Sequence, residues 1–140
     1  MSGKEIFYPM LAMVALTLVV WLRLYIVRIP EMRRLRIHPQ SVATSAQKSA
    51  RLVDTRAADN FVNLFEMPVL FYLALVVAHL TAQVTPLVLG LAWAFVACRL
   101  LHSLIQCTYN KVMHRFTVYS ISTILAWVLW AVLAAGLLRG

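Results

Sequence analysis

Four apolar runs, each long enough to cross a bilayer, constrain the fold of this chain more than any other feature. They are Ile6 to Val27, Phe61 to Thr81, Pro86 to Thr108 and Phe116 to Leu138. A helix needs about 20 apolar residues to span the roughly 30 Å hydrocarbon core of a membrane. Because 62% of the residues are hydrophobic and only 13% are charged, an ordinary soluble domain is excluded. We therefore expect an all-α integral membrane protein, a bundle of four spanning helices.

The length and the short connections indicate a single domain, residues 1–140. The apolar runs leave no stretch in which a separate soluble catalytic domain could fold, so any chemistry is expected at or inside the membrane. The second and third runs are separated only by residues 82–85. Such a short connection predicts an antiparallel pair of helices, with Pro86 in a first turn where its missing N–H is tolerated.

The formal net charge of +8 is distributed unevenly along the chain. The connection 28–60 holds seven Lys or Arg residues, and the connection before the fourth run adds Lys111 and Arg115. On the other side of the membrane lie only Lys4 and Arg139. The positive-inside rule therefore places both basic connections in the cytoplasm and both termini on the non-cytoplasmic side. Since topology accounts for the basic excess, we expect no nucleic-acid partner.

The long basic connection carries its own structural signals. Pro30 and Pro39 are expected to interrupt any helix early in this connection. Residues 41–60 contain neither Gly nor Pro and are rich in Ala, Ser, Gln, Lys and Arg. This composition predicts a cytoplasmic helix that runs into the second span.

Polar residues enter the second span from its cytoplasmic end. At 100° per residue, Asp59, Asn63 and Glu66 fall within about 60° of each other and form one stripe. An ionisable group at such depth costs at least a few kcal/mol and normally faces the interior of a bundle. Pro68 follows the stripe and is expected to loosen the backbone there.

The third and fourth spans contribute polar groups at a matching depth. A stripe on the third span consists of Arg99, His102, Gln106 and Tyr109. Counting along antiparallel helices places Glu66 and Arg99 roughly 10 and 15 Å inside the bilayer, so they are expected to meet. Arg115 and Tyr119 share a face where the fourth span begins. Three helices thus direct polar groups to one place near the cytoplasm.

These stripes permit two interpretations. In one, Glu66 and Arg99 form a structural ion pair, while Asn63 and His102 provide hydrogen bonds between helices. In the other, the cluster is a site for a polar anionic ligand, because the cations Arg56, Arg99 and Arg115 outnumber what Glu66 neutralises. No metal site is expected, because Cys98 and Cys107 lie off the face of the third span that carries His102.

Several motifs in these spans resemble those of one membrane protein family. Asn63-Leu-Phe-Glu66, preceded by Arg56-Ala57, is similar to the family's Asn-x-x-Glu and Arg-Ala motifs in span two. Arg99-Leu-Leu-His102 resembles its Arg-x-x-His in span three, and Arg115 with Tyr119 resembles its Arg and Tyr in span four. The family is MAPEG, the membrane-associated proteins in eicosanoid and glutathione metabolism. The whole pattern looks most like its bacterial branch.

The resemblance implies a homotrimer that binds glutathione, as a cosubstrate, between subunits near the cytoplasmic side. It implies that Arg115 stabilises the glutathione thiolate and that Tyr119 donates a hydrogen bond nearby. The residues implied in binding the tripeptide are Arg56, Asn60, Asn63, Glu66, Arg99 and His102. The family's Arg lies four residues before its Asn, whereas here Arg56 lies four residues before Asn60 and seven before Asn63. Either Asn is therefore a candidate.

The implied function is that of a thiol-dependent transferase or peroxidase acting on lipophilic electrophiles taken from membrane lipid. The implied location is a bacterial inner membrane. Such chemistry is physically reasonable, because a cation beside a thiol of pKa about 8.5 favours the nucleophilic thiolate at neutral pH. Two alternatives stay open: a non-enzymatic lipid-binding or scaffold protein of the same fold, and a small transporter in which Glu66 is the proton-coupled carboxylate.

Overall fold

In a computed structural model, which describes residues 3–139, the chain is built from helices without any strand. The long elements are α1 (Phe7–Arg34), α3 (Arg56–Asn63), α4 (Met67–Leu80), α5 (Pro86–Cys107) and α6 (Val112–Arg139). Shorter ones are η1 (Lys4–Ile6), η2 (Pro39–Val42) and α2 (Ser45–Arg51). Four segments of the described chain are long and apolar enough to cross a membrane, with α3 and α4 together forming the second. The expected all-α, four-span fold is confirmed.

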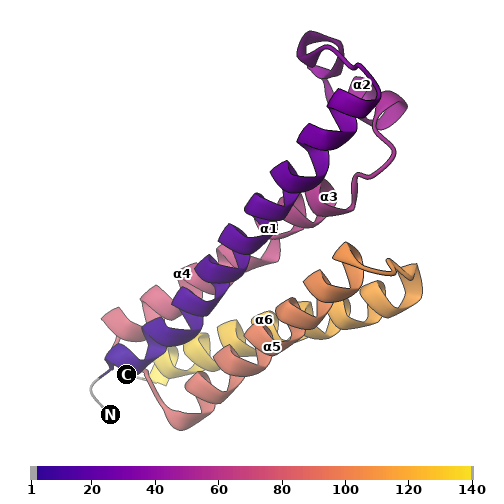
Figure 1. The fold of residues 1–140 in the computed structure, drawn as a ribbon. Helices are drawn as coiled ribbons and strands as arrows, with labels where there is room; N and C mark the ends of the chain where they lie inside the picture. Colours follow the sequence, from indigo (N-terminus) through magenta and orange to yellow (C-terminus); the bar gives the residue numbers. More distant parts are fainter. Residues whose placement is uncertain (1–2, 140) are drawn as a thin grey trace.

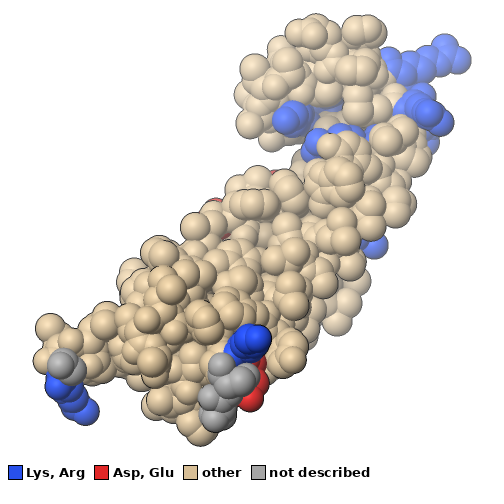
Figure 2. Space-filling model, turned by 90° about the vertical axis from the view of Figure 1, so that its left-hand side faces the viewer, with Lys and Arg blue, Asp and Glu red and all other residues tan. Residues whose placement is uncertain are grey.

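The helices pack as two antiparallel pairs that lie along one another (Figure 1). One pair is α1 with α3 and α4, and the other is α5 with α6. Both termini lie at one end of the molecule, while α2 sits at the opposite end, beyond the α5–α6 connection. Figure 2 shows several Lys and Arg side chains at that far end and a broad, mostly tan surface below it, with a few charged side chains there and at the other end. This distribution suits a bundle whose middle is surrounded by lipid.

The first helix runs farther than the sequence predicted. It continues through Pro30 to Arg34, so the expectation that Pro30 interrupts the helix was wrong. Proline lacks an N–H and removes one helical hydrogen bond, but neighbouring turns can hold the chain in helical form. The basic segment thus begins on α1 itself, with Arg28, Arg33 and Arg34.

The connection to the second span is not one helix. A capping box of Thr44 and Gln47 starts α2, which ends at Arg51, and Leu52 is in an extended conformation. The buried carboxylate of Glu31 accepts hydrogen bonds from the backbone N–H groups of Val53 at 2.7 Å and of Asp54 at 3.3 Å. A continuous helix would use these N–H groups internally, so the predicted helix across 41–60 was wrong.

The second span is broken within its polar stripe. The helix α3 ends at Asn63, α4 begins at Met67, and Glu66 in between has a non-helical backbone with ψ of −105°. Pro68 lies in the first turn of α4, where its missing N–H leaves the carbonyl of Leu64 without its helical donor. The expected loosening near Pro68 is therefore present, and it falls just before the proline.

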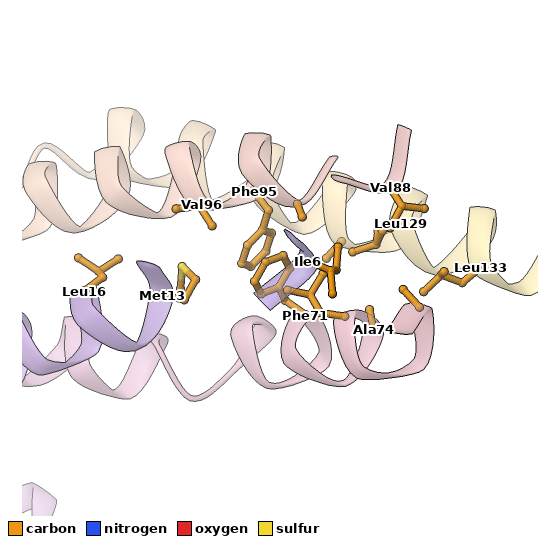
Figure 3. Packing of buried hydrophobic residues seen from close by; sticks show 14 of the residues in the cluster. Ile6, Met13, Leu16, Phe71, Ala74, Val88, Phe95, Val96, Leu129 and Leu133 are labelled. Atoms are coloured by element: carbon orange, nitrogen blue, oxygen red, sulfur yellow. The ribbon is translucent and has the colours of Figure 1, made fainter. Parts of the chain in front are cut away.

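The half of the bundle nearer the termini has an apolar interior (Figure 3). The rings of Phe71 and Phe95 stack there, with centroids 4.2 Å apart and planes 13° from parallel. Ile6, Leu129 and Leu133 are also buried in this cluster. The apolar packing fixes α4, α5 and α6 together and confines the polar groups to the other half.

Replacing Phe95 with Ala is expected to destabilise the folded protein by about 3–5 kcal/mol, because it leaves a cavity in the stacked core. The matched control is Leu104→Ala on the same helix, whose side chain is 61% exposed. Thermal and denaturant unfolding in detergent micelles measure both variants. Equal destabilisation by the two substitutions would contradict this packing.

Candidate functional site

Two asparagines of α3 face α5 and hold the two helices in register. Asn60 is fully buried; its Nδ2 donates to Sγ of Cys107 at 3.5 Å, and its Oδ1 accepts from Oγ of Ser103 at 3.2 Å. One turn deeper, Nδ2 of Asn63 donates to Oε1 of Gln106 at 3.1 Å. Both asparagines therefore use their side chains between helices, as was expected of Asn63.

Arg56 continues this row toward the membrane surface. Its guanidinium donates to the carbonyl oxygen of Thr108 and forms an ion pair with Asp54, with Nη2 and Oδ2 2.7 Å apart. The guanidinium holds the pKa of Asp54 below its usual value, chiefly through their hydrogen bond. Arg56 is thus already neutralised within the chain.

Asp59, which was expected on the polar stripe, lies outside it. Its side chain is exposed, and Oδ2 accepts a hydrogen bond from Oγ1 of Thr55 at 2.9 Å. The stripe that faces α5 is instead Arg56, Asn60 and Asn63. The predicted stripe requires one continuous helix through Glu66, but the break at residues 64–66 rotates Glu66 relative to α3.

Arg99 is the most deeply buried charged group of this region, with no exposed surface. Its Nη2 donates to the carbonyl oxygen of Asn63 at 2.8 Å, an oxygen at the end of α3 beside the break in the second span. Its Nε and Nη1 have no hydrogen-bond partner within residues 3–139. A buried donor without a partner is costly, so these atoms are suited to an anionic ligand.

Tyr119 connects the three spans around Arg99. The guanidinium carbon of Arg99 lies 5.3 Å from the centroid of the Tyr119 ring, a distance typical of a cation–π interaction. The hydroxyl of Tyr119 donates to Oε2 of Glu66 at 3.0 Å, and its ring lies 5.6 Å from that of His102. Tyr119 therefore contacts Glu66 through its hydroxyl and both Arg99 and His102 through its ring.

The ion pair of Glu66 with Arg99, which one interpretation of the stripes expected, is not formed. In the part of the chain that the structure describes, the ion pair within 4.0 Å is that of Arg56 with Asp54. Glu66 lies in the broken backbone and its side chain is exposed, so it meets Tyr119 of α6 rather than Arg99 of α5. Nδ1 of His102, expected to bond between helices, has no partner among the described residues.

The start of α6 provides a second cation. Arg115 is half-buried, and its Nη1 donates to Oδ1 of Asn110 at 2.8 Å. Tyr109, placed on the third-span stripe by the sequence, is exposed beyond the end of α5, with its hydroxyl 3.2 Å from Nδ1 of His114. The chain turns at Thr108, so helical spacing no longer applies to Tyr109.

One buried polar residue of the region, Ser103, was missed by the sequence argument. It lies four residues after Arg99 and therefore on the same face of α5. Its hydroxyl completes the hydrogen bonds of Asn60. The same face counting that selected Arg99 could have selected it.

The resulting cluster combines an excess of positive charge with one carboxylate. Arg99 and Arg115 supply two guanidinium groups against the single carboxylate of Glu66. Unpartnered nitrogen atoms of Arg99 and His102 lie buried beside Tyr119. Glu66 is exposed, and Tyr119 and Arg115 are half-buried, so part of the cluster reaches the protein surface.

The model of the MAPEG family matches residues 6–135, nearly the whole chain. The search of curated proteins found no match, and the search of solved structures found none either.

Replacing Asn60 with Ala is expected to cost about 1–3 kcal/mol of stability, because it leaves the buried Ser103 hydroxyl without its acceptor. Asp59→Ala, at the exposed neighbouring position, is the control and is expected to change stability by less than about 0.5 kcal/mol. Chemical unfolding in micelles compares them. A larger loss for Asp59→Ala would show that Asp59 and not Asn60 faces α5.

Proposed function

The chain belongs to the MAPEG family, and from that membership we propose that it is a membrane-embedded, glutathione-dependent transferase or peroxidase for lipophilic electrophiles. One observation carries the proposal: Arg99 is fully buried and two of its nitrogen atoms have no partner among residues 3–139. Glutathione fits these donors, because its carboxylates outnumber its single ammonium group. The family's general association with glutathione supports the same ligand.

The binding roles follow from charge and position. Arg99 is proposed to bind a carboxylate of the tripeptide, with His102 beside it as a second polar contact. Glu66, the one carboxylate of the cluster, is proposed to bind the ammonium group. Asn63 acts through its carbonyl oxygen, which orients the guanidinium of Arg99.

Arg56 and Asn60 have a supporting role in this proposal. Both direct their side chains at the end of α5, where Arg56 reaches Thr108 and Asn60 reaches Cys107. They hold α3 against α5 and so set the position of Arg99 relative to the break. In this proposal Asn60 holds α3 against α5, whereas Asn63 orients the guanidinium of Arg99.

We propose that the side chains of Arg115 and Tyr119 lie beside the thiol sulfur of bound glutathione. The bound thiol supplies the nucleophile, whose sulfur bonds to an electrophilic carbon or a peroxide oxygen while the leaving group departs with the electron pair. A guanidinium near the thiol favours its ionised form, which is the role proposed for Arg115. Tyr119 offers a phenolic hydroxyl between Glu66 and Arg99.

The assembly and location are also proposals. We propose a homotrimer, because Glu66 is exposed and Tyr119 and Arg115 are half-buried, and a neighbouring copy would cover them. The surrounding lipid would supply apolar substrates. We further propose a bacterial inner membrane, with the basic end in the cytoplasm and both termini outside.

The apolar half of the bundle favours this function over transport. An alternating-access path needs polar groups that reach both faces of the membrane, but the stacked Phe71 and Phe95 and their neighbours fill the half nearer the termini. The transporter interpretation of Glu66 therefore has less structural support.

Arg115→Ala is expected to shift the pH profile of the conjugation rate upward. With Arg115, the bound thiol ionises below its ordinary pKa of about 8.5; without it, the pKa returns toward that value and activity at neutral pH falls at least tenfold. The measurement is kcat/KM for 1-chloro-2,4-dinitrobenzene against pH.

The control for this experiment is Arg33→Ala, which removes an exposed cation from the end of α1. It is expected to leave the profile unchanged. A profile that is the same in Arg115→Ala as in the original protein would refute the role given to Arg115. Saturable glutathione binding without turnover would instead favour the non-enzymatic alternative.

Glu66→Gln is expected to weaken glutathione binding about tenfold or more, since a charge-assisted hydrogen bond contributes roughly 1.5–3 kcal/mol. The amide still accepts from Tyr119, so the fold is preserved. Calorimetric titration in detergent measures the affinity, with Lys111→Gln as the control at an exposed position. Unchanged affinity would exclude the ammonium site, and a Glu66-dependent proton flux in liposomes would support the transporter.

A further inference from the structure

A groove follows α1 on the side where it packs against α3 and α4. It consists of two cavities, of about 510 Å³ and about 320 Å³, that share the side chain of Phe61. Leu18 and six further α1 side chains line it, and these six recur at spacings of three and four residues: Met10, Val14, Thr17, Trp21, Leu24 and Arg28. This spacing places them on a single face of the helix, so the two cavities follow one another along α1 and meet at Phe61.

The chemistry of the groove changes along its length. The larger cavity is almost wholly apolar, whereas the smaller one, at the basic end, contains Arg28 and Lys48. Both side chains are half-buried, and neither forms a hydrogen bond or ion pair with another residue of the described chain. Asp59 is the one carboxylate lining the smaller cavity, and it accepts a hydrogen bond from Thr55. The mouth therefore has an unbalanced positive charge.

We propose that this groove binds an anionic phospholipid, with the phosphate between Arg28 and Lys48 and an acyl chain along α1. The positive mouth complements an anionic headgroup, and surface cations attract anionic lipids by about 1 kcal/mol each. The apolar floor below suits a hydrocarbon chain and offers nothing to a soluble anion.

The dimensions agree with this occupant. Half of a roughly 30 Å hydrocarbon core is about 15 Å, which corresponds to ten residues of α-helix. Counted from Arg28, this depth reaches Leu18, which lines the larger cavity. An acyl chain of one leaflet would thus pass Leu24 and Trp21, and the rings of Phe61 and Phe65 form the opposite wall with centroids 5.0 Å apart.

The groove is separate from the cluster around Arg99. It is lined by residues of α1, α2, α3, α4 and the 64–65 segment, whereas the cluster consists of Glu66 and residues of α5 and α6, none of which lines these two cavities. Lipid binding therefore does not depend on the function proposed above, and either proposal can fail alone.

The test uses Trp21 as a reporter inside the groove. The full chain is reconstituted in phosphatidylcholine vesicles that contain, in parallel samples, phosphatidylglycerol or phosphatidylcholine with brominated acyl chains. Bromine quenches tryptophan fluorescence at contact, and the difference between the original protein and Trp21→Phe isolates the signal of Trp21. We expect stronger quenching by the brominated phosphatidylglycerol.

Substitutions of the two cations at the mouth test whether they bind the lipid phosphate. Arg28→Gln and Lys48→Gln are each expected to reduce the preference for phosphatidylglycerol about fivefold, and together to abolish it. Arg33→Gln, an exposed cation that does not line these cavities, is expected to retain it. Millimolar inorganic phosphate is expected not to displace the lipid.

Three results would overturn the proposal: equal quenching of Trp21 by both brominated lipids, an unchanged preference in the double variant, or an equal loss in Arg33→Gln. Displacement by inorganic phosphate would also overturn it, by showing that the mouth binds a soluble anion. Gel filtration of each variant verifies that it retains the original assembly, so a loss of preference can be assigned to the mouth.

Discussion

The contact of Arg99 with the carbonyl oxygen of Asn63 is the interaction on which the polar half of this bundle depends. Where the second span breaks at residues 64–66, Arg99 donates to the carbonyl oxygen of Asn63 at the end of α3. A guanidinium carries its charge into this position because it meets the negative end of a short helix. Its position against Tyr119 follows, and Tyr119 in turn directs its hydroxyl to Glu66. Backbone geometry in one span thereby organises side chains from two others.

The division of the bundle into two halves explains how an otherwise apolar protein keeps such groups buried. Stacked aromatic rings and aliphatic side chains hold the helices together near the termini. The other half therefore does not need an apolar core of its own for the helices to stay packed. Asn60 and Asn63 replace apolar packing there by directed hydrogen bonds, which specify helix register more strictly than lipid-like surfaces do. The apolar half near the termini therefore stabilises the bundle, and the other half can contain the buried polar groups around Arg99.

The spanning helices could be predicted because hydropathy and length alone determine whether a segment crosses a membrane. Asn63, Arg99 and Gln106 were also predictable, since a polar group at depth must face the interior. Asp59 was placed wrongly because the predicted stripe was counted through Glu66, which the break rotates away from α3, and Tyr109 because it lies past the end of α5. The path of α1 through Pro30 likewise depends on tertiary contacts, among them the hydrogen bonds of Glu31 to the returning chain.

The length of α1 has a consequence for the host bilayer. Its 28 residues measure about 42 Å, roughly 12 Å more than an average hydrocarbon core. Because the helix is continuous to Arg34 and is tied at Glu31, the excess emerges at the basic end. A thicker bilayer draws that end toward the headgroups, whereas a thinner one favours helix tilt. Hydrophobic mismatch thus couples membrane thickness to the height of these cations above the lipid, and makes the protein responsive to the bilayer in which it resides.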